Sequence, residues 1–219
     1  MEKSKIFDYL KKQDKDVLIE LLENIYDDMS FKQKDENFGN IIEDTTLLVG
    51  AECEDLLSEV EVFYELSLDQ HYYSPFAVNS KNYRNIPEDT SEWIYKISNF
   101  LIWSAKLTEL GQHKCAVECF EKLYELIDAV DSGDEIIFAE ECGSWMITAD
   151  EKIYNRAFIT SLSKIRESDE EFIDSVIPLI KNDTYESFNY KTVLEIATTA
   201  QKELLEKEIK DQKIRIRGN

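Results

Sequence analysis

Residues 90–130 read TSEWIYKISNFLIWSAKLTELGQHKCAVECFEKLYELIDAV and form two long apolar-periodic segments that meet at Gly111. Apolar residues recur at the i, i+3, i+4 spacing of a helix in both segments, and the first segment is apolar around much of its circumference. A helix of that kind lies inside a structure, and Gly111 suits the left-handed turn that follows a helix. The stretch predicts a buried helical hairpin, with Thr90 or Ser91 as the cap of its first helix.

The composition of the chain favours long helices joined by short connections. It has 219 residues, of which 43% are hydrophobic and 11% aromatic, so it is able to bury a sizeable core. Only 6 glycines and 3 prolines are present, which is few for a fold of many short strands. We therefore expect an all-α fold of stacked antiparallel helical hairpins, either an α-solenoid or an irregular helical bundle, with two long irregular loops.

Further apolar-periodic segments lie on both sides of the hairpin and predict a single all-helical domain over residues 1–219. In the C-terminal part, Thr148 and Glu151 are spaced as a capping box, and Pro178 is expected to kink or end its helix early. One last helix is expected from about residue 186 to residue 211. The expected order is N-terminal helices (1–70), an aromatic loop (71–87), the central hairpin (88–130), an irregular stretch (131–147), C-terminal helices (148–211) and a basic tail (212–219).

The formal net charge is -21, from 46 acidic and 25 basic side chains. Such a charge repels nucleic-acid backbones and anionic membranes, so we expect neither as a partner. It attracts basic proteins, although an acidic surface also serves solubility alone. The charge therefore favours a basic protein partner over nucleic acid.

No secretory signal and no apolar run long enough to cross a membrane is visible in the sequence. The cysteines are Cys53, Cys115, Cys119 and Cys142, and their spacing follows no disulfide or metal pattern. We therefore expect reduced thiols and a cytoplasmic location.

Motifs for catalysis or metal binding are scarce. No phosphate-binding glycine loop and no Gly-x-Ser-x-Gly elbow is present, and the chain has 2 histidines. Cys115 and Cys119 stand one helical turn apart near His113, but a structural zinc site needs a second pair of ligands. Adjacent acids such as Asp134 and Glu135 carry little information in so acidic a chain. We expect no catalytic residue, no metal and no cofactor.

The second half of the central hairpin resembles a tetratricopeptide repeat. The run Leu110-Gly111-Gln112-His113, followed by the residues Ala116, Phe120 and Leu123, is similar to the second helix of that repeat within a 34-residue frame over residues 97–130. Ser104 stands where a glycine is usual, and the terminal proline is missing. The resemblance covers one repeat and implies a helical scaffold. The segments HYYSPF and EIIFAEECGSW resemble parts of acidic bacterial all-helical proteins, which implies no activity.

The two irregular stretches that flank the hairpin are the candidate binding regions. Both interrupt the helical pattern, and long irregular connections in compact chains are often functional. Flat aromatic rings mixed with amides and charges are common at recognition surfaces, and they also seal loops onto helices. If Trp145 packs near the aromatic loop, the two stretches form one concave feature. The candidate binding residues are His71, Tyr72, Tyr73, Phe76, Asn79, Lys81, Asn82, Tyr83, Arg84, Glu140, Glu141 and Trp145.

These observations favour a non-catalytic protein-interaction module that binds or neutralises a basic protein. The alternative is a small-molecule binder or enzyme with a pocket between helices, lined by the aromatic loop, Trp145 and carboxylates. A third reading is mimicry of nucleic acid, which needs regularly spaced surface acids. Convergent buried groups with shifted pKa values would favour the enzyme, and a broad acidic groove would favour the interaction module.

Overall fold

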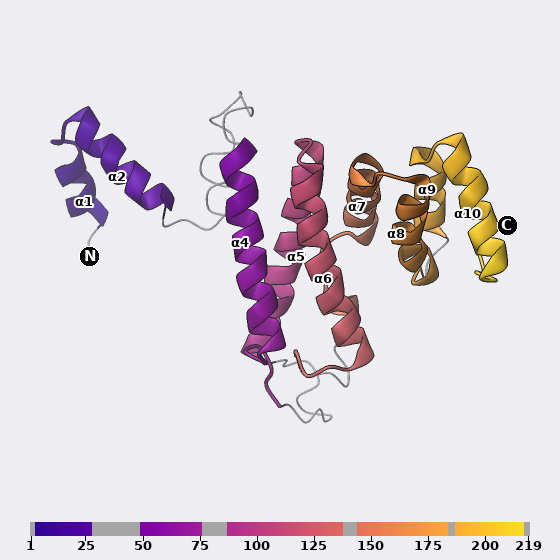
Figure 1. Ribbon diagram of the computed structural model, residues 1–219. Coiled ribbons are helices and arrows are strands. Elements are labelled where there is room, and N and C mark those ends of the chain that lie inside the picture. The colour runs from indigo at the N-terminus through magenta and orange to yellow at the C-terminus, as the bar shows by residue number, and fades with distance from the viewer. Residues whose placement is uncertain (1–2, 28–48, 76–86, 138–143, 184–186, 217–219) are drawn as a thin grey trace. The chain divides into compact units, whose positions relative to one another are not determined.

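The computed structural model describes residues 3–27, 49–75, 87–137, 144–183 and 187–216 (Figure 1). The chain divides into two compact units, Met1–Thr46 and Leu47–Asn219, and each is described by itself. Every regular element in the described ranges is helical, which confirms the expected all-α class. The expectation of a single domain stays a prediction.

The smaller unit contributes two helices, α1 (Lys3–Leu10) and α2 (Lys15–Asp27). The backbone oxygen of Asp14 accepts a hydrogen bond from the amide of Leu18 at 3.1 Å, at the start of α2. The apolar side chains of both helices are exposed rather than buried. These exposed side chains are Ile6, Phe7, Tyr9, Val17, Ile19, Leu21, Leu22 and Ile25.

The larger unit is built on α4 (Val49–Leu68), α5 (Glu88–Glu109) and α6 (His113–Ser132). Helices α5 and α6 form the predicted hairpin, and Gly111 adopts a φ of 78° at the turn between them. The hairpin is buried as its periodicity predicts. Fully buried side chains on it include Ile97, Leu101, Leu107, Ala116, Cys119, Phe120, Leu123 and Leu126.

Helix α4 runs parallel to α6. Lys122 pairs with Glu61 at 2.6 Å, and one turn further along both helices the Tyr64 hydroxyl donates to Glu125 at 2.6 Å. Pairs that advance together along both chains mark parallel helices. Since α5 runs antiparallel to α6, its first turns lie beside the end of α4, where the Trp93 indole donates to the Ser67 hydroxyl at 3.0 Å.

The C-terminal part of the larger unit adds a short 3-10 helix and four α-helices. They are η1 (Ser144–Met146), α7 (Glu151–Ile165), α8 (Asp169–Lys181), α9 (Phe188–Ile196) and α10 (Thr199–Asp211). Helix α7 packs on both helices of the hairpin, α9 packs on α7, and α10 packs on α8. No described helix combines the length and the apolar character that crossing a bilayer requires.

Two predicted helix starts are wrong. Helix α5 begins at Glu88 with Pro87 as its N-cap, and Thr90 is buried within the first turn. Helix α7 begins at Glu151 because Asp150 accepts a hydrogen bond from the amide of Lys152. The amide of Thr148 instead donates to the Ser98 hydroxyl on α5 at 3.0 Å. Thr90 is thus buried in packing, whereas Thr148 is exposed and contributes only its backbone amide to the contact with α5.

Two predicted helix ends also differ. Helix α8 continues through Pro178 to Lys181, although proline has no amide N–H to bond to the carbonyl of Asp174. The expected last helix is two helices, since Thr198 forms a capping box with Gln201 and starts α10. The turn at Ala197 lets α9 pack on α7 and α10 pack on α8.

The cysteines differ from the expectation of reduced thiols. Cys53 of α4 and Cys115 of α6 form a disulfide, with their Cα atoms 6.0 Å apart. The two cysteines are 62 residues apart in the sequence, and such a distant pair forms no recognisable spacing motif for a disulfide. Cys119 is a buried free thiol, and Cys142 lies outside the described residues. A cytoplasmic location thereby loses the support that reduced thiols would give.

Candidate functional site

Most of the predicted binding residues fall outside the described ranges. This group consists of Phe76, Asn79, Lys81, Asn82, Tyr83, Arg84, Glu140 and Glu141. Four predicted residues are described, namely His71, Tyr72 and Tyr73 after α4 and Trp145 in η1.

Tyr72 packs in the core, where its side chain is 1% exposed. Its ring centroid lies 5.6 Å from that of Phe63 on α4, and Lys96 of α5 donates to its hydroxyl at 3.1 Å. Tyr72 therefore anchors the start of the aromatic loop against two helices. The neighbouring His71 is exposed and Tyr73 is partly buried.

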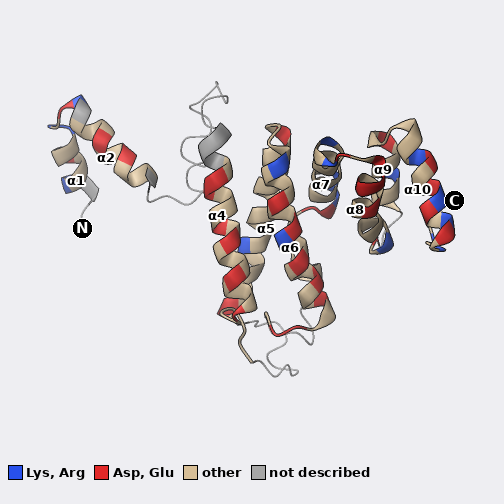
Figure 2. Cartoon of the chain, in the orientation of Figure 1, with Lys and Arg blue, Asp and Glu red and all other residues tan. Residues whose placement is uncertain are grey.

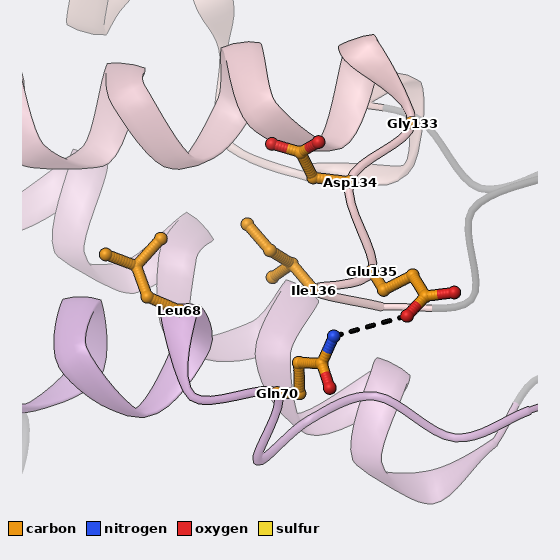
Figure 3. Close-up of a pocket in the computed structure, with 6 residues that line it drawn as sticks. All are labelled: Leu68, Gln70, Gly133, Asp134, Glu135 and Ile136. Carbon is orange, nitrogen blue, oxygen red and sulfur yellow. Dashed lines mark hydrogen bonds between the residues drawn. The ribbon is translucent and has the colours of Figure 1, made fainter.

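The described starts of the two irregular stretches meet. The side-chain amide of Gln70, just after α4, donates to the carboxylate of Glu135, just after α6, at 3.2 Å (Figure 3). These two residues, with Leu68, Gly133, Asp134 and Ile136, line a pocket of about 370 Å³. Its described lining offers no aromatic ring and no basic group, so it has few features that would select a ligand.

A larger hollow, the acidic cleft, lies among α6, η1, α7, α8 and α9 and has a volume of about 1270 Å³. Five carboxylates and one basic side chain are found among its described lining residues. The carboxylates are Glu121, Glu125, Asp128, Asp131 and Glu151, and the basic residue is Lys181. Figure 2 shows the acidic residues along α6, which supplies four of these five.

The five carboxylates differ in whether they already bind another side chain of this protein. Glu121 pairs with Arg166 at 2.7 Å, and Glu125 accepts the hydrogen bond from Tyr64. Asp128 makes no hydrogen bond or ion pair within the described part of the chain. The acidic cleft therefore contains a carboxylate, that of Asp128, whose charge no described basic residue neutralises.

Asp131 positions Trp145 at the cleft. One carboxylate oxygen of Asp131 accepts from the amide of Ser144, and the other accepts from the Ser144 hydroxyl, both at 2.8 Å. This clamp attaches η1 to the end of α6. Trp145, the next residue, lines the cleft and is 76% exposed, so its indole surface is open to a partner.

One wall of the cleft is aromatic. The rings of Tyr124 and Phe158 stack with centroids 5.0 Å apart, and Tyr154 lies edge-on to Tyr124 at 6.1 Å. The Tyr124 hydroxyl donates to Asn155, whose amide nitrogen donates in turn to Glu151 at 3.4 Å. The wall is therefore fixed by ring packing on one side and by a chain of hydrogen bonds on the other.

The electrostatic environment of the cleft disfavours further negative charge. Burial, followed by repulsion from Asp131, raises the pKa of Asp128. Burial is also the main cause of the raised pKa of Glu151, and Asp183 and Asp150 add to it. The pKa values of Tyr124 and Tyr154 are raised by burial and by Glu151. All four shifts are upward, and no basic side chain contributes to any of them.

Asn189 of α9 lines the same cleft and carries an unsatisfied acceptor. Its side chain is 3% exposed, and its amide nitrogen donates to the backbone oxygen of Leu179 at 2.9 Å. The amide oxygen Oδ1 is buried and has no hydrogen-bond partner in the described structure. Buried polar atoms normally have a hydrogen-bond partner, so this oxygen is an exception to that rule.

A second set of polar groups, around His113, packs between helices. Nδ1 of His113 lies 3.1 Å from the hydroxyl of Ser161, which lies 2.8 Å from the hydroxyl of Thr108. Ser161 is fully buried, so its hydroxyl has no access to a substrate. Burial, and then Lys164, lower the pKa of His113. In the described ranges no group of three potential ligands is placed to hold a metal ion.

Trp145 is among the candidates that the sequence suggested, and no other described residue of the cleft is. A signal was present, because the four acids of α6 follow one another at spacings of four, three and three residues and so share one helix face. No basic residue stands in the last turn of α6, although cations are favoured there. The aromatic wall and Asn189 gave no such signal, since they come from separate helices.

Comparisons with protein-family models, with curated proteins and with solved structures found no match to this chain.

Proposed function

We propose that this chain is a non-catalytic protein-interaction module that binds a basic segment of a protein partner in the acidic cleft. The observation that carries the proposal is the excess of five carboxylates over one lysine in the described lining of a cleft of about 1270 Å³. Burial, and after it repulsion from neighbouring carboxylates, raises the pKa of Asp128 and Glu151, and opposite charge on a partner would offset that repulsion.

The size of the cleft also supports a peptide segment as its occupant. Pockets for small molecules hold roughly 300–1,000 Å³ and enclose most of the ligand. The acidic cleft exceeds that range and is bordered by five helical elements. Trp145 at its rim offers the exposed aromatic surface that is common at the centre of protein interfaces.

The pKa shifts in the acidic cleft share one direction. Catalytic pairs are recognised by environments that push two pKa values apart, so that one group donates a proton and the other accepts one. In the acidic cleft Asp128, Glu151, Tyr124 and Tyr154 all shift upward. A shared upward shift fits a site that lacks a cation.

The scaffold in this proposal is a stack of antiparallel helical hairpins, with α5 and α6 as a tetratricopeptide-like pair. A particular form of the function is neutralisation, in which the partner is a basic enzyme that this chain inhibits. Charge complementarity would then speed association and make its rate depend on salt.

The alternative is a small-molecule binder or enzyme that uses the same cleft. The specific observation in its favour is the aromatic wall, where Tyr124, Tyr154 and Phe158 converge beside carboxylates with raised pKa values. A small neutral ligand would bind there with little dependence on salt, whereas a basic segment would lose affinity as salt is raised.

The test is calorimetric titration with a basic twelve-residue peptide and with its neutral counterpart at low and high salt. The double variant Asp128→Asn with Glu151→Gln removes two cleft charges. The control variant, Asp174→Asn with Glu203→Gln, removes two exposed charges that do not line the cleft. We expect binding of the basic peptide alone, weakened about tenfold by the cleft variant and little changed by the control. Equal weakening by both variants, or no preference for the basic peptide, would overturn the proposal.

A further inference from the structure

Helices α1 and α2 of the smaller unit leave their apolar side chains exposed. Eight large apolar side chains on these two helices are between 38% and 63% exposed, and none of their described side chains is buried. Helices of 8 and 13 residues are marginal in water by themselves, and packing of an apolar face is what usually stabilises such helices. The smaller unit therefore has an apolar surface that gains stability when another surface covers it.

The apolar residues of α2 gather on one side of the helix. Val17, Leu21 and Ile25 follow one another at spacings of four residues, whereas Glu20 and Glu23 lie on the other side. Figure 2 shows acidic residues on the surface of α2. A continuous apolar stripe with charges behind it is typical of a helix that packs against another helix.

The exposed apolar area of α1 and α2 is close to what one partner of a dimer buries. A large side chain has roughly 150–250 Å² of surface, so the eight side chains at these exposures present roughly 700 Å². A specific interface of standard size buries about 800 Å² on each partner. The area therefore suits a second surface of similar extent.

The charges of α1 and α2 are complementary to each other. Residues 3–12, which contain α1, carry four lysines and one aspartate, whereas α2 carries four acids and one lysine. In a two-fold dimer the same surface of both copies meets, so α1 of each copy can lie against α2 of the other. Lysines then face acids in both halves of the interface, whereas contact of α2 with α2 would place acids against acids.

The same charges disfavour other occupants of this surface. Anionic lipids would be repelled by α2 and by the net charge of -21. A partner of one sign throughout would be attracted by one of the two helices and repelled by the other. A second copy of this chain carries both signs in the matching arrangement.

We infer that α1 and α2 form a dimerisation surface, on which a second copy of this chain packs its own α1 and α2 in a two-fold, four-helix arrangement. The apolar side chains supply the buried centre, and the charges around them fix which helix lies against which. The inference goes beyond the proposed function and does not depend on it, because it uses no residue of the acidic cleft.

Sedimentation equilibrium of the full chain measures this dimer. We expect the wild type to dimerise, and we expect Leu22→Glu to raise the dissociation constant at least tenfold, because a charge then lies in the apolar centre. Val62→Glu on α4 is the matched control and is expected to leave the constant unchanged. Val62 is 53% exposed, against 50% for Leu22, and belongs to the larger unit.

A charge-reversal experiment shows whether the contact is between chains. Lys11→Glu with Lys12→Glu reverses charges next to α1, and Glu20→Lys with Glu23→Lys reverses charges on α2. Each double variant alone is expected to have a dissociation constant about tenfold higher, because like charges then meet in both halves of the interface. A mixture of the two variants is expected to form a heterodimer with the wild-type constant, since both halves again join opposite charges. A contact within one chain would be repaired only when all four substitutions stand in the same chain.

Three results would overturn the inference. They are a wild type that is monomeric at every concentration tested, a Leu22→Glu variant that dimerises as well as the Val62→Glu control, and charge-reversed variants that do not associate when mixed. A monomeric wild type that binds vesicles of phosphatidylcholine, and loses that binding in Leu22→Glu, would assign the surface to a membrane instead.

Discussion

Asp128→Asn is expected to stabilise the free chain and to weaken its binding of a basic peptide. Asp128 lies near the C-terminal end of α6, a helix with no basic residue in its last turn. A carboxylate at that end of a helix is disfavoured by roughly 0.3–1 kcal/mol. The like charge of Asp131, three residues on, adds a repulsion of roughly 0.2–0.5 kcal/mol. Because Asp128 is largely exposed, solvent screening reduces both values, and the expected gain is about 0.5–1 kcal/mol.

The pH dependence of this gain follows from the raised pKa of Asp128. The folded chain binds the Asp128 proton more tightly than the unfolded chain does, so the wild type loses stability as pH rises above the ordinary value of 3.8. The loss is complete once pH exceeds the folded-state pKa. The advantage of Asp128→Asn is therefore full at pH 7 and absent below the ordinary value, where the wild-type carboxyl is protonated in both states.

The assay is thermal unfolding followed by circular dichroism, repeated from pH 7 down toward pH 3. For a domain of this size a change of 1 kcal/mol shifts the melting temperature by about 2–4 °C, so an increase of a few degrees is expected at pH 7. Asp174→Asn on the exposed face of α8 is the control and is expected to change little. A lower melting temperature for Asp128→Asn at pH 7, or an unchanged peptide affinity, would refute the reasoning.

Three further predictions concern the helix caps and the cysteines. Asp150→Ala is expected to lower the stability of the chain by about 1 kcal/mol in urea unfolding, because Asp150 caps α7, whereas Thr148→Ala is expected to lower it less. The opposite ranking would show that the sequence-based cap is correct. Replacement of Cys53 and Cys115 together by alanine is expected to lower stability by about 2–4 kcal/mol, and a non-reducing peptide map is expected to contain their cross-linked peptides. Alkylation of both without reductant would contradict the disulfide. Burial raises the pKa of the Cys119 thiol to about 12, so iodoacetamide is expected to label Cys119 only after the chain unfolds, as peptide mass spectrometry would measure.

The hairpin was predictable from the sequence because its information is local. The period of its apolar residues, and Gly111 at the position that needs a left-handed conformation, indicate two helices and the turn between them. The N-cap of α8 depends on equally local chemistry, since the Ser168 hydroxyl accepts a hydrogen bond from the amide of Glu171. The composition was enough to indicate an all-α class.

Helix starts and breaks were less predictable, since several nearby residues suit a cap and packing selects among them. Asp150, and not Thr148, is the N-cap of α7, because the backbone amide of Thr148 donates a hydrogen bond to Ser98 on α5. The break before α10 depends on Thr198 and Gln201, a signal that was present but was outweighed by the apolar periodicity that runs across it.

The sequence by itself determined an acidic helical chain and its central hairpin. Only the tertiary structure decided that Trp145 is exposed, and that four acids of α6 line one cleft with Glu151 and Tyr154 of α7 and Asn189 of α9. It also decided that Cys53 meets Cys115. The physical reason is that helix periodicity fixes which face of a helix a residue occupies, whereas the neighbour of that face depends on how distant helices pack.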